Sequence, residues 1–159
     1  MNQTASFLAA LARHREAFNT VEQYAEQAQT LLAAVVTCLR AGGKVVWMGN
    51  GGSAADSQHL AAEFMVRYKA ERGPLASIAL TTDTSILTAH ANDYHFETVF
   101  ERQVRGLVRP GDVVIGLTTS GKSPNINLAL AAANELGAVT VAFTGRDGGL
   151  VKDIAQLPI

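Results

Sequence analysis

The segment VVIGLTTSGKSP at residues 113–124 decides the fold class of this chain of 159 residues. Its first five residues are apolar without alternation, which is typical of a strand that is buried on both faces of a sheet. Hydroxyl side chains and a glycine follow, and Ser123-Pro124 then supplies two residue types that favour the first positions of a helix. The segment therefore predicts a buried strand, a polar turn and a helix to about Leu136.

The same succession recurs on both sides of this segment. An apolar run at residues 45–48 leads into the turn 49–53 and a helix to about Tyr68, and a run at 77–80 leads into the turn 81–84 and a short helix. A further helix is expected over 96–107, a strand over 139–143, and another strand from Ile154 onward. Continuous apolar strands that alternate with helices predict an α/β fold, a doubly wound parallel sheet with helices on both faces.

Two helices are expected before the first strand. Residues 5–17 and about 20–41 are rich in Ala, Leu, Gln and Glu, and Gly42 and Gly43 end the second helix. From Leu31 to Leu39 this helix is apolar on nearly every side, which is more than one sheet contact would bury. We therefore expect a homo-oligomer in which the segment 1–43 packs, as part of a single domain that spans residues 1–159.

Composition and charge exclude several classes of function. The 13 Lys and Arg against 14 Asp and Glu leave a net charge of -1, so the basic surface of a general nucleic-acid binder is lacking, and 48% hydrophobic residues exclude a disordered chain. No apolar run approaches the roughly 20 residues that span a bilayer, and no signal peptide begins the sequence. Cys38 is the only cysteine, which suits a reducing compartment. These features predict a cytoplasmic protein.

The turns that follow the strands are the first candidates for a site, because ligands of doubly wound sheets bind beyond the carboxyl ends of the strands. The turn 49–53, Gly-Asn-Gly-Gly-Ser, contains three glycines that let a ligand approach the backbone closely. Ser53 is a candidate N-cap, with Asp56 three residues later. The pattern lacks the GxGxxG spacing of dinucleotide sites and the lysine of a P-loop.

The turn 118–123 is the sharper signal. Thr118, Thr119, Ser120 and Ser123 offer four hydroxyl groups at the opening of a helix, whose free amides and positive dipole end face the same space. This combination suits a phosphate monoester, and with Lys122 as the nearby cation it favours a small phosphorylated metabolite over a polyanion. The alternative, that these residues only cap the helix, stays open.

The helix after the glycine turn carries the candidate catalytic groups. His59, Glu63 and Arg67 recur every four residues and share one stripe, beside an apolar stripe that contains Leu60, Phe64 and Tyr68. A histidine and a glutamate at this spacing can share a metal ion, or the carboxylate can act as a base beside the imidazole. The alternative is a solvent-exposed pair that contributes little to stability.

A third polar cluster spans residues 90–95, His-Ala-Asn-Asp-Tyr-His. It is either a plain loop between helices or a source of amide and carboxylate groups for sugar hydroxyls, and the spacing does not decide between the two. His14, in the first helix, is expected on the solvated surface.

Several of these motifs together resemble the phosphoheptose isomerases of the sugar-isomerase (SIS) domain family, from the N-terminal helices to Ile159. The motifs are 49–54 (GNGGSA), Gln58-His59 with Glu63, Arg67-Tyr68, Asn92-Asp93, 119–123 (TSGKS) and 144–149 (TGRDGG). The resemblance implies a flavodoxin-like sheet and an enzyme that converts sedoheptulose 7-phosphate to D-glycero-D-manno-heptose 7-phosphate, a precursor of bacterial lipopolysaccharide. It also implies a cytoplasmic homotetramer with active sites at subunit boundaries, and zinc as a metal that members can bind.

The resemblance assigns roles by position. Glu63 would transfer the proton, and His59 with Glu63 would bind zinc, one ion per subunit. The residues that would bind the sugar phosphate are Asn50, Gly51, Gly52, Ser53, Glu63, Asn92 and Asp93, with Thr118, Thr119, Ser120 and Ser123 around the phosphate. No role follows for Arg67 or His90. Whether zinc is catalytic or structural stays open, because a carboxylate bound to zinc is a weaker base.

The family pattern continues, beyond the position of Leu157-Pro158-Ile159, with a loop and a long helix that supply a Gln and a His. Because zinc usually has about four ligands, two on one helix are an incomplete set. Either a further segment follows Ile159 and supplies these ligands and the partner acid on which activity depends, or the protein does not catalyse. We expect a further segment, because a sheet that ends in a bare strand leaves apolar surface uncovered.

Two other functions remain as alternatives. One is a non-catalytic SIS protein that binds a replication-initiator partner, and the other is a sugar-phosphate sensor of a regulator. Glu63 together with His59 favours the enzyme, since the non-catalytic protein needs no acid–base pair. The near-neutral charge counts against the sensor.

Overall fold

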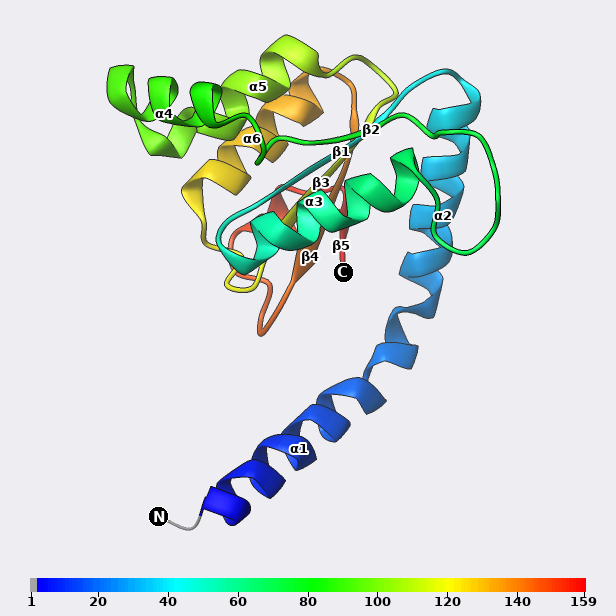
Figure 1. Ribbon diagram of the computed structural model, residues 1–159, viewed down its shortest axis with the longest axis vertical. Helices are drawn as coiled ribbons and strands as arrows, with labels where there is room; N and C mark the ends of the chain where they lie inside the picture. The colour runs from blue at the N-terminus through cyan, green and yellow to red at the C-terminus, as the bar shows by residue number, and fades with distance from the viewer. Residues whose placement is uncertain (1–2) are drawn as a thin grey trace.

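The computed structural model describes residues 3–159 and contains one parallel β-sheet with helices on both faces (Figure 1). The strands are β1 (Val45–Gly49), β2 (Ser77–Ala79), β3 (Val113–Thr118), β4 (Val139–Thr144) and β5 (Leu157–Pro158). Their order in the sheet is β2-β1-β3-β4-β5, and every neighbouring pair is parallel. This is the doubly wound, flavodoxin-like order, so the predicted fold class is confirmed.

Helices fill the segments between the strands. They are α1 (Gln3–Asn19), α2 (Ala25–Arg40), α3 (Gly52–Met65), α4 (Thr84–Asp93), α5 (Val99–Leu107) and α6 (Pro124–Glu135), with short 3₁₀ helices η1 (Val21–Tyr24), η2 (Phe96–Thr98) and η3 (Val151–Asp153). Within residues 3–159, no helix is long and apolar enough to cross a membrane.

The core has two halves, one on each face of the sheet. Successive side chains of β1 point to opposite faces, so Val46 and Met48 pack with α5 and α6 while Val45 and Trp47 pack with α2 and α3. Apolar side chains form both halves, which is why the strands are continuous apolar runs rather than alternating ones.

A buried ion pair joins the strand ends that lie opposite the candidate turns. The Asp112 carboxylate accepts hydrogen bonds from Lys44 Nζ at 2.6 Å and from the backbone N–H groups of Lys44 and Arg109 at 2.9 and 2.8 Å. Burial alone would raise the pKa of this carboxyl, but the three hydrogen bonds outweigh burial and hold the pKa below its ordinary value. Asp112 therefore stays ionised and fixes β1 against β3.

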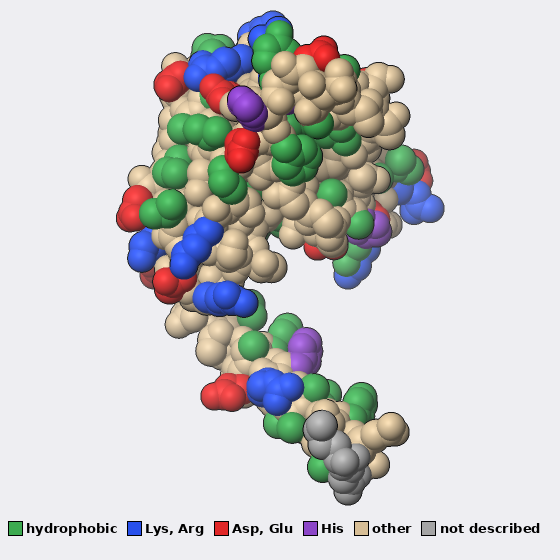
Figure 2. Space-filling view, turned by 90° about the vertical axis from the view of Figure 1, so that its left-hand side faces the viewer, with side chains coloured by type: hydrophobic (Ala, Val, Ile, Leu, Met, Phe, Trp, Pro, Cys, Tyr) green, Lys and Arg blue, Asp and Glu red, His purple; other side chains and the backbone are tan. Residues whose placement is uncertain are grey.

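Helix α1 forms an arm that stands clear of the body, whereas α2 lies against the body (Figures 1 and 2). The break between the two predicted helices is confirmed at Thr20, and α2 packs on the sheet through Val35 and Cys38. By contrast, α1 buries none of its described residues, and Phe7 and Phe18 are each 67% exposed. This arm presents apolar surface that the rest of the chain does not cover.

Three local predictions were wrong. Helix α3 ends at Met65 rather than near Tyr68, so Arg67 and Tyr68 do not continue the polar and apolar stripes of the helix. The loop that follows folds back, and its Leu75 N–H donates to the carbonyl of Phe64.

Ser53 is not the N-cap either, because α3 starts at Gly52 and the N-cap position is occupied by Gly51, which has a φ of 56°. Ser53 makes no capping hydrogen bond. The last strand begins at Leu157, since Ile154 still belongs to the turn after η3.

Candidate active site

The candidate residues gather first at the carboxyl ends of β1 and β3, which are neighbours in the sheet. The helices that follow these strands lie on opposite faces of the sheet, α3 on one and α6 on the other (Figure 1). Doubly wound folds bind ligands at such a point of the sheet. The glycine turn, residues 49–53, and the hydroxyl turn, residues 118–123, lie here, at the carboxyl ends of β1 and β3.

The glycine turn is open where a ligand would approach it. A Cβ atom added to Gly51 or Gly52 would meet no other atom within 4 Å, so neighbouring atoms do not require glycine at Gly52. Gly49 differs, since a Cβ there would lie 2.5 Å from the carbonyl oxygen of Ser53. Gly49 is therefore needed for the tight turn into α3, whereas Gly51 and Gly52 leave backbone accessible.

Asn50, in the same turn, forms a reciprocal amide pair with Asn125 in the first turn of α6. Asn50 Nδ2 donates to Asn125 Oδ1 at 2.9 Å, and Asn125 Nδ2 donates to Asn50 Oδ1 at 2.9 Å. Sequence reasoning missed Asn125, because 75 residues separate the two and only the register of β1 on β3 brings them together. Asn50 also lines a small pocket of about 140 Å³ with Thr81 and Phe96.

The hydroxyl turn has its predicted position at the start of α6. Thr118 is buried and donates to Ser123 Oγ at 3.3 Å, whereas Ser120 Oγ accepts from the backbone N–H of Lys122 at 3.2 Å and Thr119 is exposed. Ser123 occupies the N-cap position before Pro124, but its side chain makes no capping hydrogen bond. The hydroxyl groups are thus not consumed by capping, which favours an anion cradle over a plain helix start.

A second loop supports the hydroxyl turn from behind. Gly121 has a φ of 64°, and a Cβ there would overlap the carbonyl of Gly148, while Gly149 lies against the carbonyl of Ser120. Val151 N–H also donates to the Gly121 carbonyl at 3.0 Å. The glycines of the 144–149 segment therefore fit the turn by close backbone packing, a role that the sequence pattern alone did not reveal.

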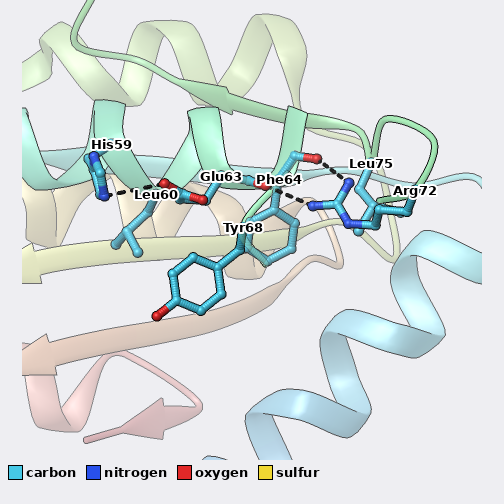
Figure 3. Close-up of a pocket in the computed structure, with 7 residues that line it drawn as sticks. All are labelled: His59, Leu60, Glu63, Phe64, Tyr68, Arg72 and Leu75. Carbon is cyan, nitrogen blue, oxygen red and sulfur yellow. Dashed lines mark hydrogen bonds and ion pairs between the residues drawn. The ribbon is translucent and has the colours of Figure 1, made fainter. Parts of the chain in front are cut away.

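His59 and Glu63 lie one turn apart on α3 and point toward each other (Figure 3). His59 Nε2 is 3.5 Å from Glu63 Oε1, and the two side chains are 74% and 29% exposed. Both line a pocket of about 400 Å³ whose other walls are mostly apolar, formed by Leu60, Phe64, Tyr68, Arg72 and Leu75. Glu63 is therefore half-sheltered beside apolar surface rather than surrounded by bulk water.

Arg72 closes the end of α3 and was not anticipated from sequence. Its Nη1 donates to the carbonyl of Phe64 at 2.9 Å and its Nη2 to the carbonyl of Glu63 at 2.7 Å (Figure 3). These carbonyls belong to the last turn, which has no helical N–H partners, so the guanidinium replaces a glycine C-cap. Arg67, which sequence placed on the catalytic stripe, instead pairs with Glu71 in the exposed loop at 3.5 Å.

The carboxylate and the hydroxyl turn of one chain do not share a pocket. The pocket of Glu63 contains no residue of the turns 49–53 or 118–123. Helix α3 starts beside the glycine turn at Gly52, and with a rise of 1.5 Å per residue Glu63 lies roughly 16 Å further along it. The two halves of the predicted site are therefore apart within a single chain.

The 90–95 cluster is also separate from the glycine turn. Residues 90–93 form the last turn of α4, where exposed Asn92 donates from Nδ2 to Asp93 Oδ1 at 2.8 Å. Asp93 lines a pocket with His90 and Tyr94 that does not include Asn50. His90 is buried, with Nε2 at 2.8 Å from Thr98 Oγ1 and its ring stacked on Tyr94. His14 is exposed on α1, as predicted.

Metal-ligand side chains are sparse in this part of the chain. Among residues 3–159, no three His, Cys, Asp or Glu side chains gather closely enough to hold an ion. His59 and Glu63 offer one imidazole and one carboxylate of the types that zinc prefers, which is half of the usual four ligands.

The chain matches the SIS domain family over residues 7–145. The phosphoheptose isomerase of Aquifex aeolicus is 60% identical over 136 residues, which are 86% of this chain and 71% of that protein. The phosphoheptose isomerase of Paramagnetospirillum magneticum is 56% identical over 82% of this chain and 68% of that protein.

Solved structures agree with these matches. A phosphoheptose isomerase from Neisseria gonorrhoeae, 42% identical, superposes with a TM-score of 0.90 over 98% of this chain and 82% of that chain. One from Francisella tularensis, 31% identical, has a TM-score of 0.94 over 99% of this chain and 85% of that chain. The chain therefore belongs to the phosphoheptose isomerase family of SIS-domain proteins.

Proposed function

We propose that this protein is an aldose–ketose isomerase that converts sedoheptulose 7-phosphate to D-glycero-D-manno-heptose 7-phosphate. The observation that carries the proposal is Glu63, whose half-sheltered carboxylate lines a pocket beside His59 in a chain of this family. The reaction removes a proton from the carbon next to the carbonyl and returns one to the neighbouring carbon. A carboxylate can take and return that proton, and general acid–base help of this kind typically contributes about 10²–10⁴-fold.

The hydroxyl turn would hold the phosphate of the sugar. Ser120 and Ser123 offer hydroxyl groups that no helix cap consumes, and the amides of the first turn of α6 add the positive end of the helix dipole. Asn50, Gly51 and Gly52 would contact the sugar at the adjoining turn. Anchoring the phosphate supplies binding energy remote from the reacting carbons, and this energy orients them for proton transfer.

The separation of Glu63 from the hydroxyl turn supports an active site shared between copies of the chain. A seven-carbon sugar phosphate is shorter than the roughly 16 Å of helix that lies between Gly52 and Glu63. The arm is the candidate contact, since α1 exposes apolar side chains such as Phe7 and Phe18. We therefore include in the proposal a homo-oligomer, a tetramer, in which Glu63 or Asn92-Asp93 of one subunit completes the site of another.

The proposal includes zinc, with His59 Nε2 and the Glu63 carboxylate as two of its ligands. When bound, zinc would polarise the substrate carbonyl or fix the geometry around it. The His59–Glu63 distance of 3.5 Å suits two donors that converge on one ion. The chain's own contribution is to hold both donors on adjacent turns of one helix.

We place this activity in the cytoplasm, in the supply of heptose for bacterial lipopolysaccharide. The single, buried and free cysteine, Cys38, is in keeping with a reducing compartment. The non-catalytic partner-binding protein and the sensor are not favoured, because relatives that are 60% and 56% identical over the matched residues are named phosphoheptose isomerases.

The experiment is to assay conversion of sedoheptulose 7-phosphate by the protein expressed from its complete reading frame. Glu63→Gln should lower kcat by at least about 100-fold, because the amide cannot accept the proton. Glu135→Gln, which makes the same charge change at a surface ion pair with Arg105, should leave kcat unchanged. No turnover by the unmodified protein, or full turnover by Glu63→Gln, would refute the proposal.

A further inference from the structure

Among the side-chain hydrogen bonds described for residues 3–159, the reciprocal amide pair between Asn50 and Asn125 is the one contact that joins the glycine turn to the start of α6. Its two hydrogen bonds of 2.9 Å join the glycine turn after β1 to the first turn of α6 after β3. Asn125 is only 3% exposed, whereas Asn50 is half-buried and lines a pocket. The pair therefore runs from the protein interior to the edge of the candidate site.

The chemistry of the pair leaves Asn50 with capacity for a ligand. Each carboxamide has two N–H donors and two acceptor lone pairs, and the pair uses one donor and one acceptor of each residue. Asn50 retains one N–H and one lone pair, while Asn125 prevents its side chain from rotating. A side chain held in this way binds a sugar without a further loss of rotamer freedom.

We propose that Asn125 is a positioning residue for the sugar, which acts through Asn50 and does not touch the substrate itself. It sets the plane of the Asn50 carboxamide, and it fixes the distance between the turn that contacts the sugar and the turn that binds the phosphate. The inference rests on the proposed function, because it takes the ligand to be a sugar phosphate that spans both turns. It adds a residue to which neither the motifs nor the family resemblance gave a role.

Burial explains why the position needs an amide. A leucine at 125 would fill a similar volume but could neither donate nor accept, so Asn50 would lose both partners and turn freely. A serine would be too short to reach Asn50. Neither change alters the hydroxyl groups of residues 118–123, so the phosphate cradle should persist in both variants.

The test compares Asn125→Leu and Asn125→Ser with the unmodified protein, each from the complete reading frame. Asn134→Leu is the matched control, because Asn134 lies at the other end of α6 and its half-buried amide donates to the Ile154 carbonyl and accepts from Thr140 and from exposed Gln156. Four quantities are measured: kcat and KM for sedoheptulose 7-phosphate, its affinity by calorimetry, the inhibition constant of inorganic phosphate, and the melting temperature.

We expect both Asn125 variants to lose roughly 10- to 100-fold in kcat/KM and in sugar-phosphate affinity, while the inhibition constant of phosphate changes less than about twofold. Asn134→Leu should lower the melting temperature with kcat/KM unchanged. Unchanged sugar-phosphate affinity in the Asn125 variants would overturn the inference, as would an equal loss of phosphate affinity, because Asn125 would then only stabilise α6.

The serine variant keeps the test decisive if the leucine variant does not fold. Failure of the proposed function gives a different result, namely an unmodified protein that binds the sugar phosphate without converting it. The ratio of sugar-phosphate affinities between each Asn125 variant and the unmodified protein would then still test whether Asn125 positions the sugar. An unmodified protein that does not bind the sugar phosphate at all would overturn both.

Discussion

Replacing Arg72 should loosen the end of α3 and with it the Glu63 carboxylate, which we propose transfers the proton. Arg72 donates two charged hydrogen bonds, of 2.7 and 2.9 Å, to the carbonyls of Glu63 and Phe64. A hydrogen bond to a charged group contributes about 1.5–3 kcal/mol when buried, and the partial exposure of Arg72 reduces this. We expect Arg72→Ala to destabilise the protein by about 1–2 kcal/mol, which corresponds to a fall in Tm of about 2–8 °C.

Turnover should respond as well, because one of these bonds holds the backbone of Glu63 itself. Arg72→Ala should lower kcat roughly tenfold, since a small displacement of a catalytic group is costly. Arg72→Lys should recover only part of this loss, because an ammonium lacks the planar fork that reaches two carbonyls.

The matched control is Arg109→Ala. Arg109 donates to the carbonyls of Gly106 and Val108 at the end of α5, remote from the pocket of Glu63. The Arg109→Ala variant should have a modestly lower Tm and an unchanged kcat. Thermal unfolding and initial rates on the same preparations provide both readouts. An Arg72→Ala protein with the Tm and kcat of the unmodified protein would refute the reasoning.

Three further predictions follow from other contacts. Gly121→Ala should lower the free energy of unfolding by about 2–4 kcal/mol in chemical denaturation, because Gly121 has a positive φ and the added Cβ would overlap the carbonyl of Gly148. A loss below about 0.5 kcal/mol would contradict this packing. Ser120→Ala with Ser123→Ala should raise KM for the sugar phosphate strongly, at about 1.5–3 kcal/mol per lost hydrogen bond to a charged group, and an unchanged KM would place the phosphate elsewhere. The pKa of Asp112 is lowered in the folded state, so the unfolded chain binds this proton more readily. The stability that the ionised Asp112 contributes is therefore present above about pH 4 and is lost as the pH falls through the folded-state pKa. Unfolding of Asp112→Asn between pH 2 and pH 6 should show a flatter acid limb, and an identical limb would mean that Asp112 does not contribute to acid sensitivity.

The alternation of strands and helices could be predicted because buried parallel strands and polar turns have different compositions. Val113–Thr118 and the turn after it were recognisable from sequence, since burial on both faces excludes polar alternation. The end of α3 was not recognisable. Neither Gly nor Pro follows the last residue of the helix. The helix ends at Met65 because the loop after it folds back, and Arg72 and the Leu75 N–H donate hydrogen bonds to the carbonyls of its last turn.

The site was predicted in its parts and missed in its connections. The hydroxyl turn and the pair His59 and Glu63 carry local signals, namely clustered hydroxyl groups and spacing by four. The partners that fix these parts, Asn125 and Arg72, have no local signal, because Asn125 meets Asn50 only through the register of two strands and Arg72 reaches α3 from a loop. Assembly from several chains leaves even less trace in the sequence than a contact within one chain.

The most direct test of the account is solvent deuterium exchange during turnover. The complete protein would be incubated with sedoheptulose 7-phosphate in D₂O, and deuterium at the carbon next to the carbonyl would be followed by NMR. If Glu63 carries the proton, the unmodified protein incorporates deuterium and Glu63→Gln does so at least about 100-fold more slowly. A Glu63→Gln protein that exchanges deuterium as fast as the unmodified one would contradict the account.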